Sequence, residues 1–345
     1  MMSRKTLAIL AAVVVALVAI SIAQSLGHRR ATSREATAVL VAAELKADDL
    51  SRIVLGRGAE PEAVVLEAGP DGWRVASLWN ARANRERIDA LLKAVSGLSG
   101  EFRSDRREVL PDYGLAADAA VTVRAFGKYG KEVLSLEVGN RPEGAGGNFV
   151  KLPGRDEVYL CATGVLSHLG IYGAPETPRP RMFLDLFAVQ EDRAGVDAIR
   201  LHDKDGDRAF EKVFAGAPAG GDSAAVAAAR ATWEWKTGGG PARSLAKAKV
   251  DPVLNALVSV HANDLDDPAA PAATYGLDAP TRTATLVMAE GRQVVLEFGA
   301  DRAAAGDRPG GTWMRVRGRP EVWVVTEYML KNVFKTVAEL VPDKT

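Results

Sequence analysis

The sequence contains one cysteine and four histidines among 345 residues. The single thiol, Cys161, excludes an intrachain disulfide and any metal site built from several thiolates. Each histidine is at least 34 positions from the next, so no pair has the i, i+4 spacing of a helical zinc site. We therefore predict no metal and no cofactor, and we interpret Cys161 as a buried structural thiol.

An excess of charge of either sign is also missing. The chain has 44 Lys and Arg against 44 Asp and Glu, whereas a dedicated nucleic-acid-binding protein carries a basic excess. Residues 1–34 hold five basic side chains and no acidic one, so the rest of the chain is mildly acidic. We predict no nucleic-acid partner.

The sequence motifs of common catalytic sites are absent as well. There is no P-loop and no Gly-x-Ser-x-Gly sequence, and the glycines at 144–147 and 238–240 lack the context that a phosphate-binding loop requires. Two acidic groups, Asp203-Asp205-Asp207 and Asp264-Asp266-Asp267, lack the spacing of an EF-hand or a match elsewhere in the chain. We interpret both as solvated loops and predict a protein that is not an enzyme, without catalytic residues.

One long apolar run is present near the N-terminus. Residues 6–27 carry no charge and have basic residues on both sides. A helix of this length is about 33 Å long, enough to cross a hydrocarbon core of about 30 Å. We predict a retained signal anchor in the bacterial inner membrane, with the body on the periplasmic side. The alternative is a secreted chain cleaved near Ala23.

The body contains an internal repeat. Trp73 aligns with Trp235, and the helical stripe that begins at Ile88 aligns with the one that begins at Val250. Three further blocks recur in the same order along the chain: Tyr113-Gly114-Leu115 with Tyr275-Gly276-Leu277, 134–139 with 294–299, and 146–160 with 310–324.

These blocks predict an α+β fold made of two tandem repeats. Short strand signals come before the helical stripe in each copy, and alternating strands follow it, as in an antiparallel β-meander with one or two helices packed on it. The expected parts are a membrane anchor at 1–34, a first repeat at 35–173, a Pro-rich connector at 174–181, and a second repeat at 182–345 with a Gly/Ala-rich insertion at 215–231.

The recurring positions are mostly aromatic or belong to the Tyr-Gly-Leu turn. Large aromatics usually anchor a core, but they also line binding grooves. Two interpretations are therefore kept for these positions, as core anchors or as the lining of a groove. Gly114 and Gly276 are expected to adopt a backbone angle that a side chain would forbid. The candidate positions are Trp73, Tyr113, Gly114, Leu115, Tyr159, Trp235, Tyr275, Gly276, Leu277, Trp313 and Trp323.

This pattern resembles the uncharacterised bacterial domain of unknown function 4340, over roughly residues 45–340. The Gly-Trp strand, the Tyr-Gly-Leu turn, the strand ending in Gly139 or Gly299, and the Glu-Val-Tyr/Trp strand carry the resemblance. The first copy lacks the proline that follows Tyr-Gly-Leu at Pro280. The resemblance implies a single-anchor envelope protein associated with ABC-type transport or gliding-type systems, and it implies no catalytic residue.

The leading hypothesis is a membrane-anchored accessory or scaffold protein with membrane-protein partners, in contact with lipid through residues 6–27. The near-neutral body and the open edges of a meander favour protein contacts over binding of a polyanion. The alternatives are a peptide- or glycan-binding envelope module that uses the recurring aromatics, and an envelope hydrolase.

Overall fold

The computed structural model describes residues 37–214, 233–289, 291–306 and 308–343. The chain divides into two compact units, Met1–Phe183 and Leu184–Thr345, which we call unit 1 and unit 2. The predicted anchor at 6–27, the cleavage position near Ala23 and the insertion at 215–231 lie outside the described residues. Within the described ranges, no helix is both long and apolar enough to cross a membrane.

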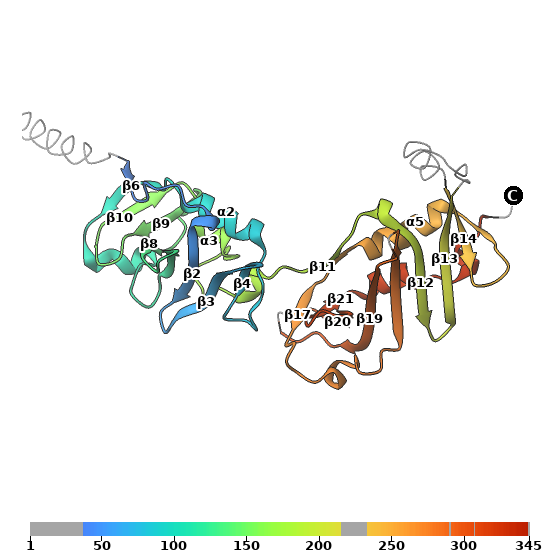
Figure 1. Ribbon diagram of the computed structural model, residues 1–345. Coiled ribbons are helices and arrows are strands. Elements are labelled where there is room, and N and C mark those ends of the chain that lie inside the picture. The colour runs from blue at the N-terminus through green and yellow to red at the C-terminus, as the bar shows by residue number, and fades with distance from the viewer. Residues whose placement is uncertain (1–36, 215–232, 290, 307, 344–345) are drawn as a thin grey trace, which may run out of the picture. The chain divides into compact units, whose positions relative to one another are not determined.

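Unit 1 is built on one ten-stranded antiparallel sheet (Figure 1). The strand order is β1-β6-β10-β9-β8-β7-β2-β3-β4-β5, so two meanders meet where β2 pairs with β7. The strands are β1 (Ala38–Val39), β2 (Leu50–Arg57), β3 (Glu60–Gly69), β4 (Gly72–Val75), β5 (Ala81–Arg82), β6 (Ser99–Ser104), β7 (Val121–Gly127), β8 (Glu132–Val138), β9 (Asn148–Lys151) and β10 (Val158–Cys161).

The main helix of unit 1, α2 (Arg85–Val95), forms where the apolar stripe predicts it. The Asn84 side chain caps the helix by accepting a hydrogen bond from the Arg87 amide at 3.1 Å. Ile88, Leu91 and Leu92 share the stripe and are buried, so the helix packs by one face. The remaining short helices are η1 (Ala47–Asp49), η2 (Arg107–Tyr113), α3 (Val165–His168) and η3 (Pro180–Phe183).

Unit 2 contains a nine-stranded antiparallel sheet and a separate pair of strands (Figure 1). The order of the large sheet is β15-β14-β13-β12-β18-β19-β20-β21-β17, and β11 pairs with β16. The strands are β11 (Phe187–Gln190), β12 (Val196–Asp203), β13 (Gly206–Phe214), β14 (Trp233–Gly238), β15 (Ser244–Leu245), β16 (Ser259–His261), β17 (Asp264–Asp266), β18 (Arg282–Met288), β19 (Gln293–Arg302), β20 (Gly311–Val316) and β21 (Val322–Val325).

The main helix of unit 2, α5 (Lys247–Val258), buries Val250, Val253 and Leu254 and packs against α6 (Glu327–Val333). A proline inside the helix, Pro252, has no N–H to donate to the preceding turn. The Thr336 hydroxyl and the Glu339 carboxylate form a capping box at the start of α7 (Val337–Leu340). The described part of unit 2 also contains the 3-10 turns η4 (Arg193–Gly195) and η5 (Ala272–Tyr275).

The Tyr-Gly-Leu turn has the same backbone conformation in both units. Gly114 and Gly276 have φ of +67° and +64°, as predicted, and each ends a 3-10 helix. Each turn lies against the end of a strand. A Cβ added at Gly139 would overlap the carbonyl oxygen of Tyr113, and one added at Gly299 would overlap that of Tyr275.

The fold is α+β and largely β, with antiparallel sheets. One departure from a simple meander in unit 1 follows the main helix. After α2 the chain enters β6, which pairs with β10 and not with its sequence neighbours β5 and β7. Residues 174–179 have no regular secondary structure, and the division between the units falls after Phe183.

Candidate functional site

A row of three polar residues crosses neighbouring strands in unit 1. Thr122 on β7 stands opposite Glu137 on β8, and Glu137 stands opposite Lys151 on β9. The Lys151 ammonium lies 2.5 Å from Glu137 Oε2, and their side chains are 9% and 18% exposed. Since an ammonium has three N–H donors, this buried pair leaves Lys151 with further donor capacity.

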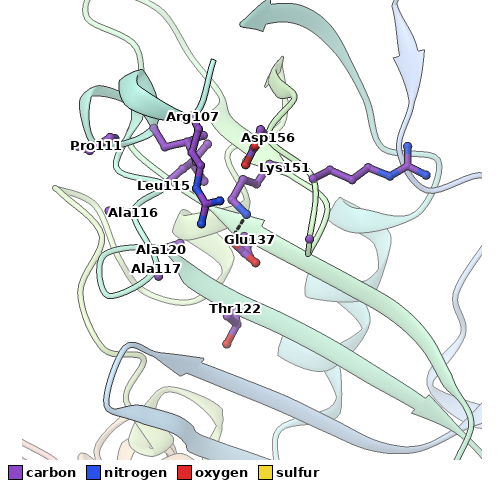
Figure 2. Close-up of a pocket in the computed structure, with 13 residues that line it drawn as sticks. Arg107, Pro111, Leu115, Ala116, Ala117, Ala120, Thr122, Glu137, Lys151 and Asp156 are labelled. Carbon is purple, nitrogen blue, oxygen red and sulfur yellow. Dashed lines mark ion pairs between the residues drawn. The ribbon is translucent and has the colours of Figure 1, made fainter. Parts of the chain in front are cut away.

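The row forms one side of a pocket of about 570 Å³ in unit 1 (Figure 2). Arg107, at the start of η2, extends toward the part of the pocket where Lys151 and Glu137 meet. Three cationic and two anionic side chains line the pocket, which therefore carries one net positive charge. The lining residues are Arg107, Leu110, Pro111, Leu115, Ala116, Ala117, Ala120, Thr122, Glu137, Lys151, Gly154, Arg155 and Asp156.

Unit 2 has a row of the same kind with different surroundings. Thr283 on β18 faces Glu297 on β19, which faces Arg315 on β20. Arg315 donates to Glu297 Oε2 from Nη2 at 2.7 Å and from Nε at 3.1 Å, while Arg317 donates to Oε1 at 2.8 Å. Arg315 also donates to the carbonyl of Leu277. Both oxygens of this carboxylate are therefore held by guanidinium groups.

Two opposing effects set the pKa of Glu297. Burial raises it, because a charged carboxylate is disfavoured away from water. The hydrogen bonds from Arg315 and Arg317, together with their charges, outweigh burial, and the pKa lies below its ordinary value. Glu297 is therefore an ionised, fully paired carboxylate at neutral pH.

The acidic group at 264–267 is not a solvated loop, so our interpretation of this segment is wrong. Asp264 and Asp266 lie on β17 and are 4% and 7% exposed. Arg302 and Arg308 pair with both carboxylates, and the indole N–H of Trp313 donates to Asp266 at 2.8 Å. The arginines are 36 to 44 positions away in the sequence, which is why a local reading of charge missed them.

The other acidic group is only partly solvated. Asp203 and Gly206 close the β12–β13 hairpin, whose turn contains the Asp205-Gly206 pair that is typical of tight hairpin turns. Asp207 is exposed and contacts the ring of His202 at 2.7 Å. The Asp203 carboxylate, however, is 8% exposed and paired with Arg208 at 2.6 Å, so this part of the prediction is also wrong.

The recurring aromatics lie mainly inside the units. Trp73, Trp235, Tyr275 and Trp323 are buried, at 6%, 0%, 5% and 3% exposure. Trp313 is half-buried, and its ring packs on Tyr275 with the centroids 5.3 Å apart.

Two of the counterparts in unit 1, Tyr113 and Tyr159, are less buried than Tyr275 and Trp323. Tyr113 and Phe149 are half-buried, with ring centroids 4.7 Å apart, and Tyr159 packs on Phe102 at 6.1 Å. Of all the recurring candidate positions, Leu115 lies in the lining of the unit 1 pocket. Its counterpart Leu277 supplies the carbonyl that accepts from Arg315.

A second aromatic pair lies on β14. The rings of Trp233 and Trp235 are 5.3 Å apart on one face, as their alternation predicts. Lys212 lies 4.8 Å from the Trp233 ring centroid and donates to the Arg193 carbonyl. Burial lowers the pKa of Lys212. The pair therefore packs around a largely buried lysine.

The thiol of Cys161 is buried, and burial raises its pKa to about 12. A thiol with this pKa is a poor nucleophile at neutral pH. Among residues 37–214, 233–289, 291–306 and 308–343, no group of three or more His, Cys, Asp or Glu side chains could hold a metal ion.

The sequence analysis missed the residues of the two rows, although the signal was present. Glu137 and Glu297 occupy the same position in the aligned segments 134–139 and 294–299. Lys151 and Arg315 occupy the same position in the segments 146–160 and 310–324. Two recurring charges of opposite sign on adjacent strands indicate a cross-strand pair.

Comparison with known proteins assigns a family but no activity. No curated protein and no solved structure matches this chain. One family model, described as Domain of unknown function (DUF4340), matches residues 73–280. The match is a single span that begins in unit 1 and ends in unit 2, and it does not confirm two separate copies of the domain. It covers more than half of the sequence, and the chain therefore belongs to the DUF4340 family.

Proposed function

We propose that this protein is a membrane-anchored accessory or scaffold protein that faces the periplasm and is associated with an ABC-type transport or gliding-type envelope system. The observation that carries the proposal is the uncharged segment at 6–27 ahead of two compact units. An anchored chain with two folded units can hold membrane-protein partners close to the bilayer, while residues 6–27 contact the lipid.

The two units are, on this proposal, copies of one module. The strand orders support it: β5-β4-β3-β2-β7-β8-β9-β10-β6 in unit 1 has the same chain connectivity as β15-β14-β13-β12-β18-β19-β20-β21-β17 in unit 2. The rows Thr122–Glu137–Lys151 and Thr283–Glu297–Arg315 occupy equivalent strands in these orders.

Partners contact side-chain surfaces on this proposal, and not the sheet edges. The edge strands β1, β5 and β15 have two residues each, and β17 has three. Such short edges offer few free backbone groups for an added strand. The expectation that open meander edges serve as contact surfaces therefore has little support.

The second candidate, a peptide- or glycan-binding module lined by the recurring aromatics, has less support. Trp235 and Trp323 are buried, and the indole N–H of Trp313 is bound to Asp266. These rings leave little apolar surface on which a ligand could stack.

A topology experiment tests the anchor and the orientation. A reporter that is active only outside the cytoplasm, fused after Thr345 of the full chain, should be active, and the protein should stay in the membrane fraction after alkaline extraction. A matched chain lacking residues 1–27 should give a cytoplasmic reporter. A fusion of the full chain that reports only from the cytoplasm would overturn the proposed orientation.

Affinity purification tests the scaffold role. The full chain with a C-terminal tag, solubilised in detergent, should retain specific membrane proteins. The matched control is a tagged chain that keeps residues 1–34 and replaces the two units with an unrelated soluble domain. Equal recovery of the same proteins with both chains would show that the units recruit no partner.

A further inference from the structure

We propose that the unit 1 pocket is a binding site for a carboxylate carried on a short apolar group. The inference goes beyond the scaffold function and does not depend on the anchor, because all the lining residues lie between Arg107 and Asp156. It rests on the charge of the pocket, on its apolar wall and on a comparison with the equivalent region of unit 2.

The charged half of the pocket can accept an anion. Lys151 is paired with Glu137, while Arg107 extends toward the same part of the pocket (Figure 2). Within the described residues, Arg107 and Arg155 form no side-chain ion pair. A ligand carboxylate between Arg107 and Lys151 would receive charge-assisted hydrogen bonds from two side chains and would neutralise the excess positive charge.

The other half of the pocket favours a ligand with an apolar part. Apolar side chains from η2 and from the segment that begins with the leucine of the Tyr-Gly-Leu turn form a wall beside the charged row. These residues are Leu110, Pro111, Leu115, Ala116, Ala117 and Ala120. A small hydrated inorganic anion gains nothing from this wall, whereas a branched chain of a few carbons buries apolar surface on it.

A proline occupies the β9–β10 turn of unit 1 at the position where unit 2 has an arginine. Both turns contain a hydrogen bond of the same type, from Arg155 N to Leu152 O and from Arg319 N to Val316 O. In the aligned segments, Pro153 stands where unit 2 has Arg317. Arg317 donates the second guanidinium to the unit 2 carboxylate, and proline has no side chain that could do the same for Glu137.

The arginine that follows each turn glycine also differs in its contacts. In unit 2, Arg319 donates to the carbonyl of Ala188 at 3.0 Å. In unit 1, Arg155 lines the pocket. The arginine that is bound to a backbone carbonyl in unit 2 therefore lines the pocket in unit 1.

The same chemistry could come from a free branched carboxylic acid or from the last residue of a peptide. The probes are 4-methylpentanoate, the peptide acetyl-Ala-Ala-Leu with a free carboxylate, the same peptide as its C-terminal amide, and inorganic phosphate. Isothermal titration calorimetry on the full chain in detergent measures each affinity. We expect the carboxylate peptide or the free acid to bind with a Kd of roughly 1 mM or tighter.

The relative affinities identify the source and can refute the proposal. Tighter binding of the carboxylate peptide than of 4-methylpentanoate supports a peptide terminus, and the reverse supports a free acid. Failure of both carboxylates to bind overturns the proposal. It is also overturned if the amide binds as well as the acid, or if phosphate binds as tightly as the carboxylates.

Two variants tie the binding to this pocket. Arg107→Gln should weaken carboxylate binding roughly 10-fold or more, because it removes a charge-assisted hydrogen bond. The matched control Arg106→Gln removes the neighbouring charge, whose side chain does not line the pocket, and should leave the Kd within about two-fold. Unchanged affinity in Arg107→Gln would overturn the proposal.

Discussion

Unit 1 and unit 2 place a glutamate at equivalent positions of their sheets but neutralise it in different ways. Glu137 has one lysine as its partner and lies beside an open pocket. Glu297 has two arginines, and one of them is also bound to a backbone carbonyl. One turn position contributes to the difference, because Arg317 pairs with Glu297 whereas Pro153, at the matching position in unit 1, has no donor for Glu137.

The backbone that supports both rows is held in the same way, and this gives the largest expected effect. Gly139→Ala and Gly299→Ala should each lower the free energy of unfolding of their own unit by about 3 kcal/mol, since the added Cβ overlaps a tyrosine carbonyl. Denaturant unfolding measures the loss, and hydrogen exchange assigns it to a unit.

The controls are Gly146→Ala and Gly240→Ala, where an added Cβ has no atom within 4 Å. These should change stability by less than about 0.5 kcal/mol. If Gly139→Ala were tolerated and Gly299→Ala were not, the two turns would not be equivalent.

Replacing the glutamate of the row should destabilise unit 1 more than unit 2, because the cation that loses its partner is more deeply buried in unit 1. Glu137→Gln leaves the ammonium of Lys151, 9% exposed, without a charged partner, and should cost about 3 kcal/mol. Glu297→Gln should cost less, about 2 kcal/mol, because Arg317 is 62% exposed and Arg315 keeps its bond to Leu277. Urea unfolding of the two variants gives the comparison, and the reverse order would contradict it.

Acid should weaken unit 2 through its paired carboxylates. Because Glu297 has a folded-state pKa below the ordinary value of 4.5, its stabilising contribution is complete above 4.5 and is lost as the pH falls through the folded-state pKa. Just below pH 4.5 the Glu297 carboxylate of the folded protein is still mostly ionised, so the loss of stability there is smaller than the loss that Glu297→Gln causes. Other groups with lowered pKa should add to it: Glu191, Asp203, Asp251, Asp266 and Glu339.

Thermal unfolding of the parent chain and of Glu297→Gln between pH 6 and pH 3.5 measures this contribution. The free energy of unfolding of the parent should fall toward that of the variant as the pH decreases. A difference between the two proteins that stays constant over this range would show that Glu297 does not contribute to the acid sensitivity.

The smallest effect is expected from removing an exposed ion pair, which should change the stability of either unit very little. Lys331→Gln removes an i, i+4 pair with Glu327 whose side chains are 69% and 78% exposed. Arg103→Gln removes a pair with Glu101 at 40% and 59% exposure. Each should change the free energy of unfolding by less than about 0.5 kcal/mol, and a loss above 1 kcal/mol in either unit would contradict this.

Local patterns predicted much of the secondary structure correctly. The stripe from Ile88 to Val95 gives α2, and the Asp-Gly turn gives the β12–β13 hairpin. These features depend on residues close in sequence, whose spacing reflects the helical or extended period directly. The position of β6 beside β10 was not predicted, because the pairing joins segments more than 50 residues apart.

The candidate site also combines features that depend on local sequence with features that depend on residues far apart in the chain. Gly114 and Gly276 could be assigned a positive φ from their turn sequence alone. Asp264 and Asp266 looked like solvated charges, because their partners Arg302 and Arg308 become neighbours only through the pairing of distant strands.

Helix α2, the β12–β13 hairpin, the tight Tyr-Gly-Leu turns and the recurrence of a glutamate and a basic residue at matching positions follow from the sequence, because each depends on residues that are close along the chain. The tertiary structure decided which charges meet, because register alone brings Glu137 opposite Lys151 and Glu297 opposite Arg315. It also brings Arg107 to the pocket beside the unit 1 row and Arg317 to the carboxylate of the unit 2 row, because these contacts depend on how the chain packs around each sheet.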